Sequence, residues 1–333
     1  MGSGDGKRRH PRGFGMVGGS QSPLWRLLDK NAKTLLPLGG TGDGTPLYCI
    51  HSISGEVTSF NKMAEKVGTD RRIYGFQAPR DKMGAEFARS VPDIASHYVD
   101  ILTTFQPEGP LMLGGWSVGG PIALEMAQQL KARGRTVTLL MVVDGILYNS
   151  GAELTRWNPL YYLKLAANLP SWVADNVLSG WGWSGIWVRI KRELKHNLSG
   201  LTDRKVGRGS VVDAFMDTSI LPEKQAAFAR ALFAATEDYV PKPYDGPVLV
   251  YAAKTHPLLH LHQVDVAWRK IAGRGTDIVY MAGTHLSMLR EPQVSVLSAH
   301  LRSYVDRLEM RSAVGAQEGA SRPPAVGQPL TQN

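Results

Sequence analysis

A serine flanked by glycines gives the first indication of chemistry in this sequence. Residues 115–119 read Gly-Trp-Ser-Val-Gly, with an apolar run before them and helical spacing of apolar residues after them. This G-x-S-x-G pattern, between a strand and a helix, is typical of a tight turn that holds a nucleophilic serine at the carboxyl edge of a sheet. A plain glycine-rich turn is the alternative, but it would need neither flanking element. We therefore predict that Ser117 is a nucleophile.

The serine needs two partners. A serine hydroxyl is a weak nucleophile near neutral pH, so a base must lie within hydrogen-bonding reach and a third group must orient that base. Asp144 ends the β-branched run 136–143, and His285 comes shortly after the last predicted strand, residues 276–281. The chain order Ser, Asp, His is the one found on α/β-hydrolase scaffolds. The predicted catalytic residues are therefore Ser117, Asp144 and His285.

Asp265 is the main alternative to Asp144 as the acid, because it also follows a late strand. Together with His256, His260 and His262 it raises the further alternative of a metal site. The spacing of these histidines matches no strong zinc pattern, and His260 and His262 would face different sides of a helix. We therefore favour Asp144 as the acid and expect neither a metal nor a cofactor in the site.

Backbone N–H groups are the expected stabilisers of negative charge on a reacting carbonyl oxygen. The turn that carries Ser117 offers the N–H of Val118, and the loop after the first predicted strand offers that of Ile53. His51 follows the same strand, but it precedes the serine in the chain and lies where this loop should be. We assign His51 to shaping the loop rather than to catalysis.

The elements around these residues alternate between strands and helices. Apolar and β-branched runs at 46–50, 72–76, 110–114 and 136–143 are separated by stretches with helical spacing, one of which begins at the N-cap Ser90. This alternation predicts an α/β fold of the α/β-hydrolase type. Its central sheet would be mostly parallel, with helices on both faces and the site at the carboxyl ends of the strands.

The domain organisation follows from where this alternation begins and stops. Residues 1–34 are predicted to be a flexible basic leader, residues 35–311 the folded domain, and residues 312–333 a disordered tail. Within the domain, the stretch at about 147–239 loses the strand pattern and is predicted to form a helical lid insertion over the site.

Trp181 and Trp183 are the expected substrate-binding residues of this lid, because tryptophan supplies large and rigid apolar surface. The alternative is a structural helical subdomain whose tryptophans fill only its own core.

Composition limits the classes of function. With 333 residues and 43% hydrophobic content, the chain is long enough for one large α/β domain with an insertion. No apolar stretch has the ~18–20 residues of a membrane span, so we expect a cytoplasmic protein without one. The net charge of +9 comes without a recognisable nucleic-acid-binding motif, so no nucleic-acid partner is predicted. Cys49, the single cysteine, lies in an apolar run and is expected to be buried.

With these residues placed, the sequence resembles the thioesterase domains of nonribosomal peptide and polyketide synthases, a branch of the α/β-hydrolase superfamily. The resemblance spans about residues 35–308. It rests on an entry segment at 35–51, a second marker at 73–78, the serine turn and its helix at 115–130, and a histidine motif at 283–289.

The resemblance implies a serine thioesterase that releases an acyl or peptidyl chain from a carrier-protein phosphopantetheine thioester through an acyl-Ser117 intermediate. Release by water and cyclisation by an internal amine or hydroxyl both stay open. The implied partner is an acyl or peptidyl carrier protein or an upstream synthase module, and phosphopantetheine arrives as part of the substrate. The alternatives are a carboxylesterase or lipase acting on free oxoesters, and a hydrolase-like scaffold that binds acyl ligands without turnover.

Overall fold

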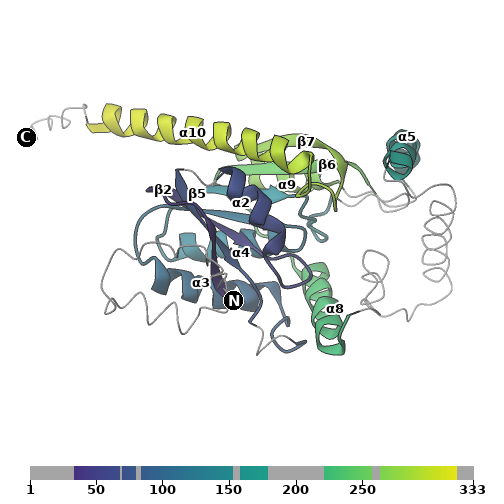
Figure 1. Ribbon diagram of the computed structural model, residues 1–333, viewed down its shortest axis with the longest axis horizontal. Coiled ribbons are helices and arrows are strands. Elements are labelled where there is room, and N and C mark those ends of the chain that lie inside the picture. The colour runs from purple at the N-terminus through teal and green to yellow at the C-terminus, as the bar shows by residue number, and fades with distance from the viewer. Residues whose placement is uncertain are drawn as a thin grey trace, which may run out of the picture.

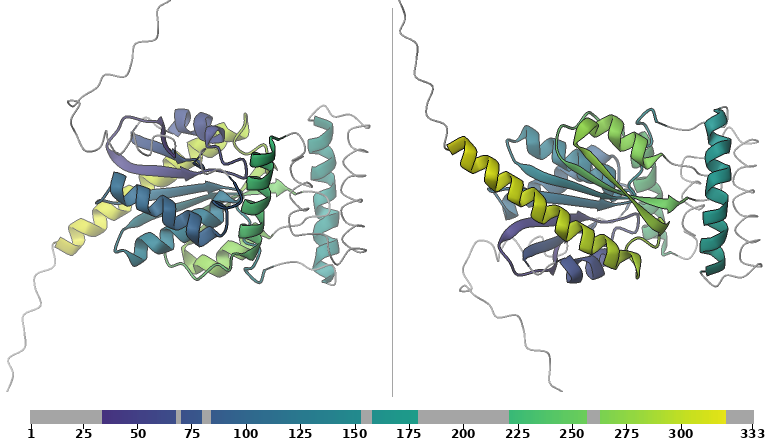
Figure 2. Two further views of the ribbon diagram at one scale, coloured as in Figure 1. Left: turned by 90° about the horizontal axis from the view of Figure 1, so that it is seen from below. Right: turned by 90° about the horizontal axis from the view of Figure 1, so that it is seen from above.

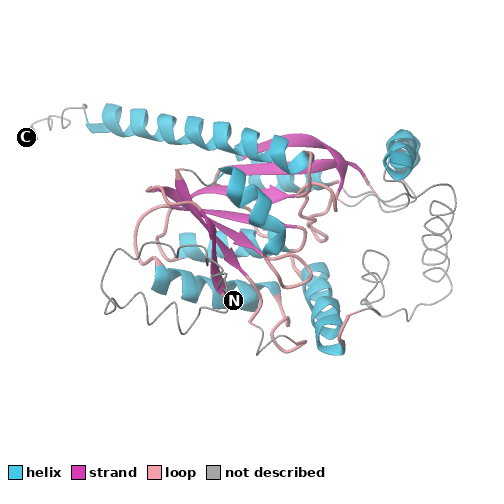
Figure 3. Cartoon of the chain, viewed as in Figure 1, coloured by secondary structure: helices cyan, strands magenta, loops and turns pink. Residues whose placement is uncertain are grey.

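The computed structural model describes residues 34–67, 70–79, 84–152, 158–178, 221–256 and 263–320. These residues form a central sheet with helices on both of its faces (Figure 1, Figure 3). The seven strands are β1 (Leu35–Gly39), β2 (Gly44–Ile50), β3 (Arg71–Phe76), β4 (Leu111–Trp116), β5 (Val137–Val143), β6 (Val248–Thr255) and β7 (Thr276–Thr284). The described α-helices are α2 (Asn61–Val67), α3 (Val91–Phe105), α4 (Gly119–Ala132), α5 (Pro159–Leu178), α8 (Glu223–Asp238), α9 (Val264–Ala272) and α10 (Gln293–Ala320).

The strands lie in the order β1-β3-β2-β4-β5-β6-β7. β1 is antiparallel to β3, and every other neighbouring pair is parallel. Parallel neighbours need a crossover connection, which here is supplied by the helices between them. The predicted α/β architecture, a mostly parallel central sheet covered on both faces, is therefore confirmed.

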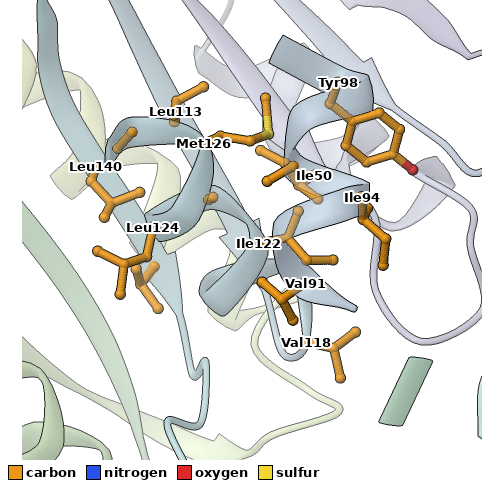
Figure 4. Close-up of a cluster of buried hydrophobic side chains, with 14 of the residues drawn as sticks. Ile50, Val91, Ile94, Tyr98, Leu113, Val118, Ile122, Leu124, Met126 and Leu140 are labelled. Carbon is orange, nitrogen blue, oxygen red and sulfur yellow. The ribbon is translucent and has the colours of Figure 1, made fainter. Parts of the chain in front are cut away.

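The sheet builds a separate core on each face, because side chains alternate along every strand. On β2, Tyr48 and Ile50 join the apolar cluster that contains α3 and α4, whereas Leu47 and Cys49 join the cluster that contains α2 and α10. Figure 2 shows α10 crossing one face, and Figure 4 shows apolar side chains of the cluster on the other. Cys49 is fully buried, as its apolar run predicted.

The connections of the sheet change direction between β2 and β4. The chain leaves β2 through α2 on one face to reach β3, and it leaves β4 through α4 on the opposite face to reach β5. In such a sheet the two loops part at the carboxyl ends of the strands and leave a crevice in which ligands bind. The two connections begin at His51, which follows β2, and at Ser117, which follows β4.

The edge strand β1 was not predicted. The sequence pattern placed the first strand at residues 46–50, whereas Leu35–Gly39 already pairs antiparallel with β3. This strand is short and contains Pro37, which lacks an N–H and is therefore tolerated in strands only at a sheet edge.

The last helix of the domain extends beyond its expected end. Helix α10 continues to Ala320, past residue 311, where the disordered tail was expected to begin. Residues 312–320 include three alanines, Gln317 and Glu318, and these residue types favour helix. The predicted leader up to residue 33, the tail from residue 321 and residues 179–220 of the predicted lid lie outside the described residues. Within the described part of the chain, no helix is long and apolar enough to span a bilayer.

Helix α3 begins as its sequence predicted. Ser90 has extended backbone and its Oγ accepts a hydrogen bond from the N–H of Asp93 at 3.2 Å, while the same hydroxyl donates to Asp93 Oδ2 at 2.7 Å. Pro92 lies in the first turn, where its missing N–H costs nothing. The position of this helix matters for the site, because it carries Tyr98.

This cap yields a stability prediction. Replacing Ser90 by Ala should lower the free energy of unfolding by about 1 kcal/mol, because the N–H of Asp93 loses its acceptor. Replacing Ser90 by Gly should cost only a few tenths of a kcal/mol, since glycine is itself a good N-cap. Urea denaturation of the two variants measures this difference. Equal losses for both variants would show that the hydroxyl does not cap the helix.

Candidate active site

Ser117 lies in a tight turn between β4 and α4, as predicted. Its backbone φ is +59°, in the left-handed region that side chains other than glycine rarely adopt. The turn is possible because its glycines are close together: a Cβ on Gly115 would lie 2.1 Å from the carbonyl oxygen of Gly119, and one on Gly119 would lie 2.6 Å from that of His51. The backbone N–H of Ser117 donates to the carbonyl of Val143 at 3.0 Å, which holds the turn against β5.

Asp144 and His285 are brought together at the carboxyl ends of β5 and β7. Asp144 Oδ2 lies 2.8 Å from His285 Nδ1, and its Oδ1 accepts a hydrogen bond from the N–H of Ala253 at 3.0 Å. The following residue, Gly145, is fixed by its carbonyl, which accepts a hydrogen bond from the indole of the buried Trp268 at 2.7 Å. The structure therefore places the predicted acid and base in direct contact.

Backbone strain also marks these residues. Within the described residues, only Ser117 and Asp144 have a positive φ without being glycine, with values of +59° and +48°. Such conformations cost of order 1–3 kcal/mol each and cluster at functional sites. The same strain at the predicted nucleophile and the predicted acid indicates that the fold specifies where both side chains point.

The carboxylate of Asp144 is kept ionised in a buried position. The side chain is 6% exposed, and burial by itself would raise its pKa. The hydrogen bond and charge of His285, together with the N–H of Ala253, outweigh burial, so the pKa of Asp144 lies below its ordinary value. At neutral pH Asp144 is therefore a carboxylate that accepts from the Nδ1–H of His285, which leaves Nε2 of the ring to act as a base.

Trp116 holds the other side of the His285 ring. The two rings are stacked with centroids 5.6 Å apart and planes 30° apart. Trp116 directly precedes Ser117, so the residue that restrains the base belongs to the turn that carries the nucleophile. The Ser117 hydroxyl and the His285 ring are not hydrogen-bonded in this structure, and catalytic contacts of this kind often tighten only when substrate binds.

The loop after β2 lies beside this turn. Ile50 pairs with Gly115 in the parallel register of β2 and β4, so the two strands end side by side. Neither the N–H of Ile53 nor that of Val118 has a hydrogen-bond acceptor among the described residues. Both predicted donors are thus available, and Val118 is the residue from which α4 begins, where the helix dipole favours negative charge.

His51 is fully buried and lies inside this loop rather than facing the crevice. Its Nδ1 lies 2.7 Å from the carbonyl oxygen of Ser52, and its Nε2 lies 2.7 Å from the hydroxyl of Tyr98. Burial lowers the pKa of His51 to about 4, against a small opposing effect of the Ser52 carbonyl, so the ring is neutral at neutral pH. A neutral ring with both nitrogens occupied is suited to holding the loop and not to transferring protons.

The alternative candidates are placed elsewhere. Asp265 lies in the first turn of α9, and its Oδ2 accepts a hydrogen bond from the hydroxyl of Tyr280 at 2.7 Å. His260 and His262 lie outside the described residues, as do Trp181 and Trp183 of the predicted lid. Among the side chains that the structure describes, no three His, Cys, Asp or Glu residues converge as a metal site would require.

Helix α5 is the first described part of the predicted lid, and it is fastened to the end of β6. The side-chain amide of Asn168 accepts from the N–H of His256 and donates to the carbonyl of the same residue, each at 3.0 Å. Asn168 is 6% exposed, so this paired contact is shielded from water. Lys164 adds a hydrogen bond to Gln263 at 2.9 Å. Helix α5 of the predicted lid therefore lies against β6, the strand between those that carry Asp144 and His285.

Two residues near the site were missed by the sequence analysis. Trp116 occupies a variable position of the G-x-S-x-G pattern, and nothing in the pattern indicates that it stacks on a histidine far away in the chain. Tyr98 sits on the apolar face of α3, and its only sequence signal is a hydroxyl among residues that are otherwise apolar. A polar atom on a buried helix face needs a partner, which is the signal that could have found it.

Comparison with known proteins supports the resemblance drawn from the sequence. Residues 45–153 match the family model described as the Thioesterase domain, a stretch that contains Ser117 and Asp144. The Dimodular nonribosomal peptide synthase of Bacillus subtilis (strain 168) is 38% identical over 128 residues, which is 38% of this chain and 5% of that protein. Polyketide synthase PksR of the same organism is 34% identical over 110 residues, 33% of this chain and 4% of that protein. The matched stretches are thus a small fraction of these relatives.

A solved structure shows the same fold over most of the chain. It is a covalent complex of the NocB thioesterase domain with a fluorophosphonate nocardicin G analogue, with a TM-score of 0.54 and 20% sequence identity. The likeness covers 82% of this chain and 99% of that one, which confirms the fold class. The family-model match and the two synthases confirm the predicted resemblance to thioesterase domains of nonribosomal peptide and polyketide synthases, and this resemblance supports a hydrolase.

The contact between Asp144 and His285 predicts that Asp144, and not Asp265, supports the reactivity of Ser117. Asp144→Asn should keep the fold but favour the wrong tautomer of His285, and the cost can reach roughly 10⁴ in kcat. Asp265→Asn is the matched control, because its side chain bonds only Tyr280 among the described residues and should leave the rate near that of the wild type. The rate at which a fluorophosphonate labels Ser117 measures both effects. If Asp265→Asn lowered the labelling rate more than Asp144→Asn, Asp265 would be the residue that orients the base.

Proposed function

We propose that this chain is a serine thioesterase that releases an acyl or peptidyl chain from the phosphopantetheine thioester of a carrier protein. The observation that carries the proposal is the 2.8 Å hydrogen bond between Asp144 and His285 at the edge where the strained turn presents Ser117. The match to the Thioesterase domain model and to peptide and polyketide synthases supports the thioester as the bond that is broken.

In the first half of the proposed reaction, Ser117 Oγ attacks the thioester carbonyl carbon and passes its proton to Nε2 of His285. The carbonyl oxygen becomes an oxyanion, which the N–H groups of Ile53 and Val118 stabilise. When the intermediate collapses, the C–S bond breaks and His285 returns its proton to the departing pantetheine sulfur. The acyl group is then an ester on Ser117, and the carrier leaves with a free thiol.

In the second half, water or an internal amine or hydroxyl of the acyl chain attacks the ester carbonyl. His285 accepts the proton of the attacking group and delivers it to Ser117 Oγ as the ester bond breaks. Water gives a free carboxylic acid, whereas an internal nucleophile gives a ring. Asp144 serves both halves, because its carboxylate stabilises the His285 imidazolium that forms each time.

The partner in this proposal is an acyl or peptidyl carrier protein or an upstream synthase module, and the chemistry uses no cofactor of the enzyme's own. The acyl chain would lie beneath the lid, whose helix α5 is fastened beside β6 through Asn168. Trp181 and Trp183 are proposed as the lid residues that contact it, because their large apolar rings suit an acyl or peptidyl group.

The proposal is tested by exposing the protein to a panel of acyl- and peptidyl-pantetheine thioesters and measuring intact mass. A thioester substrate should add the mass of its acyl group to the wild type and release free pantetheine thiol. Ser117→Ala, which loses only the hydroxyl, should show no adduct. The matched oxoesters serve as controls for the bond that is attacked.

Adducts from oxoesters in preference to the thioesters would make the protein an esterase rather than a thioesterase. Adducts that persist in Ser117→Ala would place the nucleophile on another residue. Binding of acyl groups without any adduct would instead support a non-catalytic scaffold.

A further inference from the structure

The contacts of His51 fix which of its ring nitrogens carries the proton. A carbonyl oxygen can only accept, so Nδ1, 2.7 Å from the Ser52 carbonyl, must be the nitrogen that carries hydrogen. In a neutral ring Nε2 is then an acceptor, and the group 2.7 Å away is the hydroxyl of Tyr98. The Tyr98 O–H therefore donates to Nε2, and this bond and the Nδ1–H bond support the same tautomer.

The Ser52 carbonyl determines the direction of the Ile53 N–H. The two belong to one peptide unit, which is planar and trans, so they point in opposite directions. This carbonyl accepts from His51 Nδ1 and also from the N–H of Gly55 at 3.0 Å, and Gly55 adopts a φ of +77° that closes the turn. With the carbonyl held on the His51 side, the N–H of Ile53 is turned to the opposite side of the loop.

We propose that Tyr98 is a positioning residue that acts through His51 to aim the backbone N–H of Ile53 at the reacting carbonyl oxygen. The inference rests on the proposed function, because the oxyanion exists only if Ser117 reacts. Tyr98 touches neither substrate nor reacting atoms. Its hydroxyl stabilises the Nδ1–H tautomer of His51, that tautomer holds the Ser52 carbonyl, and the carbonyl orients the N–H of Ile53.

Aromatic rings pack around Tyr98 and fix the position of its hydroxyl. The ring is fully buried and stacks on Phe76, with centroids 4.9 Å apart. It meets the ring of His51 edge-on at 5.8 Å, and Phe228 of α8 lies 6.0 Å from His51. Figure 4 shows Tyr98 on α3 as part of the apolar cluster, with its hydroxyl pointing away from the other labelled side chains. Packing alone would be served by phenylalanine, so the hydroxyl needs another explanation.

The first test compares two buried tyrosine–histidine pairs. Tyr98→Phe removes the donor to His51 and keeps the ring, while Tyr251→Phe removes a hydroxyl 3.0 Å from Nδ1 of His300 on α10. Both tyrosine rings are fully buried, but His300 is only partly buried whereas His51 is fully buried, so Tyr98→Phe should cost the more stability and labelling is compared where both variants are folded. With a small alkyl fluorophosphonate, Tyr98→Phe should label Ser117 about 10- to 100-fold more slowly at saturation, because an oxyanion donor is misaligned. Tyr251→Phe should label at the wild-type rate, and equal rates for both variants would overturn the inference.

The second test observes the tautomer directly. In ¹⁵N NMR spectra at neutral pH, wild-type His51 should carry its proton on Nδ1, and Tyr98→Phe should shift the ring toward a mixture of tautomers. A wild-type ring protonated on Nε2, or a ring unchanged by Tyr98→Phe, would overturn the inference. This readout does not depend on catalysis, so a wild type that fails to react with the fluorophosphonate would contradict the proposed function separately.

The third test uses a double-mutant cycle. Asparagine at position 51 can donate from its amide to the Ser52 carbonyl without the help of Tyr98. In the His51→Asn background, Tyr98→Phe should therefore cause no further loss of labelling rate, since the two residues act in series. If Tyr98→Phe lowered the labelling rate by the same factor in the His51→Asn background as in the wild type, Tyr98 would act by another route. That result would overturn the inference.

Discussion

The carboxylate of Asp144 connects three strand ends at the site. It belongs to the loop after β5, accepts a hydrogen bond from Ala253 of β6, and reaches across to His285 after β7. A buried charge without partners would cost several kcal/mol, so each contact supports the position of the others. The Asp144–His285 contact joins residues 141 positions apart in the chain, and the parallel register of β5, β6 and β7 brings them together. The geometry of the base therefore depends on the sheet being correctly paired.

The same edge of the sheet holds Ser117, the proposed nucleophile, and the proposed backbone donors. The connections after β2 and β4 run to opposite faces of the sheet, so the loop that begins at His51 and the turn of Ser117 start side by side at this edge. The turn depends on Gly115 and Gly119, where a Cβ would collide with backbone atoms. The loop depends on a buried histidine held from two sides. Strain in the turn and hydrogen bonds in the loop are thus two ways of fixing backbone direction at one site.

Much of this arrangement could be predicted from the sequence, because local patterns carry it. The glycines around Ser117, the strand before it and the helix after it specify the turn, and Ser90 specifies the start of α3. Asp144 and Asp265 both follow strands, and only the register of the sheet shows that the first meets His285 while the second meets Tyr280. Trp116 on His285 and Tyr98 on His51 are contacts between distant segments, which periodicity does not reveal. The edge strand β1 was missed because it is short and contains proline.

The N–H groups of Ile53 and Val118 are proposed to receive the oxyanion of a reaction at Ser117. The most direct measurement is a crystal structure of the protein after reaction with a small alkyl fluorophosphonate, whose phosphonyl oxygen stands in for the oxyanion. The account predicts phosphorus bonded to Ser117 Oγ and that oxygen about 2.7–3.1 Å from both backbone nitrogens. Phosphorus on another residue, or an oxygen directed away from the loop that His51 and Tyr98 hold, would contradict it.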